Sequence, residues 1–161
     1  MIREATRGQE REAGWRGSFR AFVVQSTDEL LTCLREFLPD ASSEQVTAWR
    51  RAVPQLQTEA SKVMESRPEA GGYAAILEYL LPMESRRPDV IFLFKGRVLV
   101  IECKGRPQVD WADIDQAHHY VTSLRHFHRE CHDRPVDVVI ALGAARFTSC
   151  RDHSGVHIAD R

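Results

Sequence analysis

Three charged residues flank two short apolar runs in the stretch RRPDVIFLFKGRVLVIECKG, residues 86–105. Asp89 precedes the first run, and Glu102 and Lys104 follow the second. Such groups suit phosphodiester hydrolysis, because carboxylates bind hard divalent cations and an ammonium stabilises the charge that develops on a phosphate. The alternative interpretation is a surface ion pair at the end of a strand, since all three residue types are common.

A tight hairpin would bring these three groups together. If Lys95 and Gly96 form a two-residue turn, the pairing of the two strands places Asp89 directly opposite Glu102. Lys104 then lies on the same face, because side chains alternate along a strand. The sequence therefore predicts two carboxylates and an ammonium in one cluster.

A divalent cation is the simplest explanation for two carboxylates in this arrangement. Like charges directly opposite each other destabilise a sheet unless something neutralises them. Carboxylate oxygens select Mg²⁺ or Mn²⁺ rather than zinc. We predict a metal site formed by Asp89, Glu102 and the backbone carbonyl of Cys103, with Lys104 orienting or deprotonating the attacking water.

Apolar periodicity predicts the elements that carry this cluster. Ser26 caps a first helix that Pro39 ends, and a second helix ends at residue 66 with a kink at Pro54. The other predicted elements are strands over 73–81, 89–94 and 97–103, a helix over 110–128 and a strand over 135–143. This order of helices, three strands, helix and strand predicts an α/β fold with a mixed sheet flanked by helices.

The 161 residues are most simply one domain. We expect the following organisation: a disordered leader over 1–18, an N-terminal helical segment over 19–54 packed on the core, the core itself over 55–145, and a polar C-terminal tail over 146–161.

The composition points to a soluble protein, with 43% apolar and 28% charged residues. No apolar run approaches the roughly 20 residues that a membrane-spanning helix needs, and the N-terminus lacks a signal-peptide pattern. Four dispersed cysteines suggest a reducing compartment, so we expect a cytoplasmic protein. The net charge of −1 argues against a broad basic surface, so any contact with nucleic acid must be local or completed by another chain.

One other metal site can be imagined near the C-terminus. Cys131, His132, Cys150 and His153 carry zinc-binding side chains. Their spacing matches no common zinc pattern, so we do not favour this alternative.

The helix that follows the hairpin carries a second polar pair. Gln116 and Tyr120 are four residues apart and therefore share one face of that helix. An amphipathic surface pair would look the same. Their position one element after the charged hairpin favours a functional role.

Together these motifs resemble the PD-(D/E)xK nuclease superfamily. The resemblance depends on Asp89 in RPDV, on Glu102-Cys103-Lys104, and on Gln116-xxx-Tyr120, which is similar to the QxxxY motif of the RecB-like branch. It covers roughly residues 55–143 and implies a restriction-endonuclease-like αβββαβ core with a four-stranded mixed sheet.

The resemblance also implies roles for these residues. Asp89 and Glu102 would bind Mg²⁺ or Mn²⁺, Lys104 would be catalytic, and Gln116 and Tyr120 would support the site or contact DNA. The implied activity is hydrolysis of DNA.

Four nearby charged residues complete the predicted site. Glu78, an unusual charge in an apolar strand, resembles the additional upstream metal-binding acid of that superfamily, and Glu84 competes for the role. Arg86 and Arg87 are candidate phosphate-binding residues, with surface solubility as the alternative.

The segments around residues 21–49 and 77–90 resemble a nuclease-like region that precedes a superfamily-1 helicase in certain bacterial proteins. This chain has no GxxxxGK[ST] loop, so any helicase or ATPase would be a separate partner. Homodimers are common among such folds. The alternative function is an inactive module of the same fold that binds nucleic acid or a partner, and an RNA or branched substrate is a further alternative.

Overall fold

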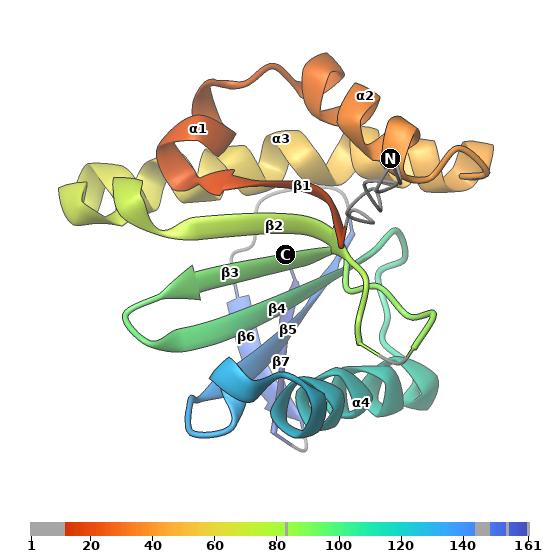
Figure 1. Cartoon of the computed structure of the whole chain (residues 1–161). Helices are drawn as coiled ribbons and strands as arrows, with labels where there is room; N and C mark the ends of the chain where they lie inside the picture. The colour runs from red at the N-terminus through yellow and green to blue at the C-terminus, as the bar shows by residue number, and fades with distance from the viewer. Residues whose placement is uncertain (1–11, 83, 144–148, 154, 161) are drawn as a thin grey trace, which may run out of the picture.

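A mixed β-sheet with helices on both faces forms this protein (Figure 1). The computed structural model describes residues 12–82, 84–143, 149–153 and 155–160. Its elements are β1 (Ala13–Ser18), α1 (Phe19–Val24), α2 (Thr27–Phe37), α3 (Ser43–Ser66), η1 (Pro68–Gly72), β2 (Ala74–Tyr79), β3 (Val90–Phe94), β4 (Arg97–Lys104), α4 (Trp111–Phe127), η2 (Arg129–Cys131), β5 (Val136–Leu142), β6 (Ser149–His153) and β7 (Val156–Asp160).

The strand order over these described residues is β1-β2-β3-β4-β5-β7-β6. Strands β1 to β4 pair antiparallel, β4–β5 and β5–β7 pair parallel, and β6 pairs antiparallel with β7. Helices α1, α2 and α3 cover one face, and α4 covers the other (Figure 1). The predicted α/β class and the order α3-β2-β3-β4-α4-β5 are therefore confirmed.

The hairpin of β3 and β4 is buried on both faces, as its two apolar sides predict. Phe92 and Ile101 belong to the core beneath α1, α2 and α3, whereas Ile91 and Val100 belong to the core beneath α4. Burial on both sides fixes the register of the hairpin, because a slip by one residue would exchange the two faces.

The predicted four-stranded sheet is wrong, because the sheet has seven strands in the described residues. Residues 13–18, assigned to a disordered leader, form β1 along the edge of β2. Gly14 lets α2 pack closely on β1, since a Cβ atom there would lie 2.5 Å from Leu34 Cδ2. Residues 1–11 lie outside the described residues.

Two further boundaries differ from the prediction. The polar tail contains β6 and β7, and β7 extends the parallel part of the sheet beside β5. The border at residues 54 and 55 falls inside α3, which is assigned as one helix with Pro54 in its interior. Within the described part of the chain, no helix is long and apolar enough to cross a membrane.

Candidate active site

The β3–β4 hairpin has the register that the sequence predicts. Lys95 and Gly96 have φ angles of 47° and 75°, which is the left-handed conformation of a type I′ turn. The ladder ends at Val90 opposite Ile101. Asp89 and Glu102 are the next residues outward, at the end of the hairpin far from the turn.

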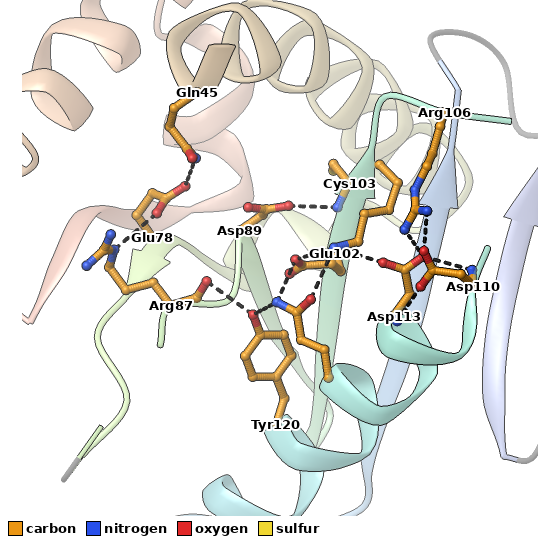
Figure 2. A network of polar contacts seen from close by, with 12 residues as sticks. Gln45, Glu78, Arg87, Asp89, Glu102, Cys103, Arg106, Asp110, Asp113 and Tyr120 are labelled. Carbon is orange, nitrogen blue, oxygen red and sulfur yellow. Dashed lines mark hydrogen bonds and ion pairs between the residues drawn. The ribbon is translucent and has the colours of Figure 1, made fainter. Parts of the chain in front are cut away.

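Asp89 is held at this rim by the backbone of β4. Its Oδ2 accepts a hydrogen bond of 2.7 Å from the amide of Cys103 (Figure 2). Burial, and then the charge of Glu102, raise the pKa of Asp89 well above its ordinary value. The carboxylates of Asp89 and Glu102 therefore lie close enough to repel each other, in a position with little access to solvent.

Glu102 is 7% exposed and has one unsatisfied oxygen. Its Oε1 accepts hydrogen bonds from Lys104 Nζ at 3.1 Å and from Gln116 Nε2 at 3.0 Å. Its Oε2 is buried without a hydrogen-bond donor. Burial raises the pKa of Glu102, although the charge of Lys104 opposes this shift.

Lys104 is surrounded by acceptors. Its Nζ lies 3.1 Å from Glu102 Oε1, 3.1 Å from Gln116 Oε1 and 3.3 Å from Asp113 Oδ1. Burial favours the neutral amine, but the negative charges of Glu102 and Asp113 outweigh it, so the pKa of Lys104 is raised. The side chain is therefore a cation at neutral pH.

Gln116 and Tyr120 connect this cluster to α4. Gln116 Nε2 donates to Glu102 and also lies 2.5 Å from the hydroxyl of Tyr120. Tyr120 is 1% exposed, and its hydroxyl donates to the backbone carbonyl of Arg87 at 3.4 Å (Figure 2). Burial raises the pKa of Tyr120, and the charge of Glu102 adds to that shift. The phenol is therefore neutral and keeps the proton that it donates to the Arg87 carbonyl.

Replacing Tyr120 by phenylalanine should leave a Gln116 amide hydrogen without its acceptor inside the protein. We expect the free energy of unfolding to fall by about 1–2 kcal/mol, the cost of one unsatisfied buried group. Urea denaturation measures this change. Tyr79→Phe, on the neighbouring β2, is the control and should change stability less; an equal loss in both variants would contradict the role given to the Tyr120 hydroxyl.

Glu78 has an unusual backbone conformation, with a φ of 52° near the end of β2. Few non-glycine residues adopt it. Its Oε1 accepts a hydrogen bond from Trp49 Nε1 at 2.7 Å. The same oxygen accepts from Gln45 Nε2 at 3.2 Å, and Oε2 lies 3.5 Å from Arg87 Nε (Figure 2). Burial raises the pKa of Glu78 despite these partners.

These contacts direct the Glu78 carboxylate toward α3. Leu77 also packs in the core beneath α3, so the positive φ places two consecutive side chains on the same side of β2. Metal binding by Glu78 stays a prediction, and it would require Arg87 to release Oε2.

The three remaining predicted site residues are Glu84, Arg86 and Arg87. Glu84 accepts from Ser123 Oγ at 2.5 Å and pairs with His119 at 2.7 Å, farther along α4. It is therefore engaged away from Asp89, which favours Glu78 over Glu84 as the nearer acid. Arg86 is exposed, whereas Arg87 is partly buried against Glu78.

Asp113, which is 4% exposed, also belongs to the cluster and was not predicted from the sequence. Its carboxylate contacts Lys104 and Arg106 and accepts from the amide of Asp110, completing a capping box at the start of α4. The Asp110-x-x-Asp113 spacing is a signal for the cap, but only the fold brings it to Lys104. Trp49 is also buried, and its hydrogen bond to Glu78 was not predicted.

The donor set fits a hard divalent cation in its chemistry. Asp89, Glu102 and the backbone carbonyl of Cys103 could supply oxygen ligands. Glu102 Oε2 is buried and has no hydrogen-bond partner. No group of three or more His, Cys, Asp or Glu side chains suited to a metal occurs among the described residues. A metal ion at this position would therefore depend on two carboxylates, with water completing the coordination, as is usual for Mg²⁺.

The zinc alternative involves Cys150 and His153, whose side chains lie outside those described.

Comparisons with known proteins found no relative of this chain. No protein-family model, no curated protein and no solved structure matches it.

Proposed function

We propose that this protein is a metal-dependent nuclease that hydrolyses phosphodiester bonds in DNA. The observation that carries the proposal is the pair of carboxylates at one hairpin rim, with Glu102 Oε2 buried and unpartnered and Lys104 beside it. DNA as the substrate follows from the resemblance to PD-(D/E)xK nucleases.

Asp89, Glu102 and the carbonyl of Cys103 would hold Mg²⁺ or Mn²⁺. Such an ion, when bound, polarises a phosphate and lowers the pKa of a bound water. A cation would also relieve the repulsion between the carboxylates of Asp89 and Glu102, which would explain why both are kept at this rim.

Lys104 acts as a positive charge in this proposal. Its raised pKa makes a proton-accepting role unfavourable, whereas an ammonium stabilises a phosphate as its negative charge grows. Gln116 holds the ammonium and the Glu102 carboxylate together, since its amide bonds to both. Tyr120 fixes Gln116 in turn.

Phosphate contacts outside the cluster would come from Arg86 and Arg87, because both flank Asp89 in the chain. Binding of a phosphate by Arg87 would compete with its ion pair to Glu78. The resemblance also suggests partners: a separate helicase or a second copy of the chain. The biological setting that it suggests is defence, repair or recombination.

A second candidate function is a catalytically inactive binding module of the same fold. It is favoured by the absence of a three-residue metal cluster among the described side chains and by the three acceptors that already engage Lys104. Such a module would bind nucleic acid or a partner without cleaving it.

Cleavage of end-labelled DNA distinguishes the two functions. Single-stranded, duplex and branched DNA and an RNA strand are incubated with Mg²⁺, Mn²⁺ or a chelator. We expect cleavage of DNA that requires metal and is lost in Asp89→Ala. Asp115→Ala, which changes an exposed aspartate on α4, is the matched control and should cleave normally. Binding without cleavage at any metal concentration would support the inactive module.

A further inference from the structure

A polar cleft adjoins the candidate active site on the side of the sheet that α3 covers. Its volume is ≈ 350 Å³. One wall is the N-terminal half of α3, with Thr47, Ala48 and Arg51, and the other is formed by the ends of β4 and β5, with Cys103 and Lys104. Because Cys103 and Lys104 also belong to the proposed metal and phosphate site, a ligand in this cleft would lie next to the reacting phosphate.

Arg51 is a charged side chain of this cleft without a partner among the described residues. It is exposed, and no hydrogen bond or ion pair joins it to another residue in that part of the chain. Its neighbour Arg50 does not line the cleft, and Arg50 Nη1 lies 3.6 Å from Asp28 Oδ1 on α2. A guanidinium matches the oxygens of a phosphate well, so Arg51 is available to bind one.

The other charged residues of the cleft leave room for an anion beside Arg51. The ammonium of Lys104 is held by Glu102 and Gln116. Glu44 is an acid of the cleft and lies seven residues before Arg51, which is about 10 Å along the helix. A hydrogen bond with its own amide lowers the pKa of Glu44, so its carboxylate is stabilised by the start of α3.

The size of the cleft fits one nucleotide. Ala48, Ala52 and Ala141 leave space between α3 and the sheet. At Gly105, a Cβ atom would meet no described atom within 4 Å, so this space extends along the backbone that follows Lys104. Pockets for small ligands have volumes of about 300–1,000 Å³, so ≈ 350 Å³ suits a single nucleotide rather than a base pair.

We propose that this cleft binds one unpaired nucleotide of the substrate strand, next to the phosphate that is cleaved. Arg51 contacts the phosphate of this nucleotide, and its sugar and base pack between Ala48 and Ala141. The identification of the strand as DNA rests on the proposed nuclease function. A nucleotide in a duplex must leave its base pair and its stack to enter, whereas an unpaired strand avoids this cost. The favoured substrate is therefore single-stranded DNA.

Binding of a short labelled DNA single strand, measured by fluorescence anisotropy with a chelator present, tests the role of Arg51. We expect Arg51→Ala to weaken binding by about threefold to tenfold, because one charge-assisted contact is a large share of the affinity for a short strand. The slope of the logarithm of the binding constant against the logarithm of salt concentration should decrease in magnitude by about 0.7, the value for one phosphate contact on a single strand. Arg50→Ala is the matched control and should change neither quantity.

Filling the cleft is the second test. Ala48 is exposed on α3 and leucine is also a good helix former, so Ala48→Leu should fold normally. It should weaken binding of the single strand by about fivefold or more, the effect expected for one overpacked side chain. It should leave binding of a blunt duplex unchanged, because paired bases do not enter the cleft. Thr58→Leu, at an exposed position of α3 that does not line the cleft, is the control and should bind as the wild type does.

Cleavage measured with Mn²⁺ separates this proposal from that of the nuclease. If the wild type cleaves the strand, Arg51→Ala should raise KM with kcat nearly unchanged, which is the pattern of lost substrate binding. If the wild type binds the strand without cleaving it, the nuclease proposal fails, and weaker binding by Arg51→Ala and Ala48→Leu still assigns the strand to this cleft. Binding that both variants leave unchanged, an equal loss of duplex binding in Ala48→Leu, or absence of strand binding by the wild type would overturn the cleft proposal.

Discussion

Lys104→Ala should lower the rate of DNA cleavage by about 10²–10³-fold, the usual effect of removing one group that stabilises charge in a transition state. The ammonium lies 3.1 Å from Glu102 Oε1 and is also held by Gln116 and Asp113. Single-turnover cleavage of labelled DNA with saturating Mn²⁺ measures the rate, and filter binding with a chelator measures affinity.

The expected pattern is a large loss of rate with a change in affinity of less than about threefold, because one contact contributes little to binding of a long polyanion. Lys62→Ala, an exposed lysine of α3 that pairs with Glu59, is the control and should change neither quantity. A Lys104→Ala protein that cleaves as fast as the wild type would remove the lysine from the proposed chemistry.

Asp89→Asn should stabilise the metal-free protein at neutral pH while removing its response to metal. Because the pKa of Asp89 is raised in the folded state, the folded protein holds more protons than the unfolded chain between the ordinary aspartate pKa and this raised value. Stability therefore falls as the pH rises through that window. Asparagine carries no charge, keeps an acceptor for the Cys103 amide and avoids this loss.

Urea denaturation in the presence of a chelator at pH 7 and at pH 3.5 checks the sign. We expect Asp89→Asn to gain about 1–3 kcal/mol at pH 7, because the amide removes the cost of keeping a poorly solvated carboxylate ionised, and to gain much less at pH 3.5. Asp115→Asn, at an exposed position, should show no such difference. A loss of stability at pH 7 would mean that the Asp89 charge is already compensated without a cation.

The hairpin was predictable because local chemistry determines it. Lys95 and Gly96 form the turn, and the apolar residues on both faces leave a single acceptable register. The edge strands were not predictable in the same way. Residues 13–18 contain two glycines and no alternation of apolar and polar residues. They form β1 because they pair with the edge of β2 and pack against α2.

The polar connections of the site depended on tertiary structure. Glu78 is recognisable in the sequence as an unusual charge in an apolar strand, but its left-handed backbone and its hydrogen bond to Trp49 follow from the packing of α3 on β2. The sequence around Asp113 indicates only a helix cap. Its contact with Lys104 forms because α4 packs beside the end of β4. Residue spacing identifies candidates, whereas docking of the helices decides their partners.

Calorimetric titration with Mn²⁺ tests most directly whether Asp89 and Glu102 form a metal site. The wild type should bind Mn²⁺ saturably in the absence of DNA, and binding should be lost in both Asp89→Asn and Glu102→Gln while Asp115→Asn retains it. If the wild type takes up no Mn²⁺, or if the two site variants bind it as tightly as the wild type, the carboxylates at the hairpin rim do not hold the catalytic ion.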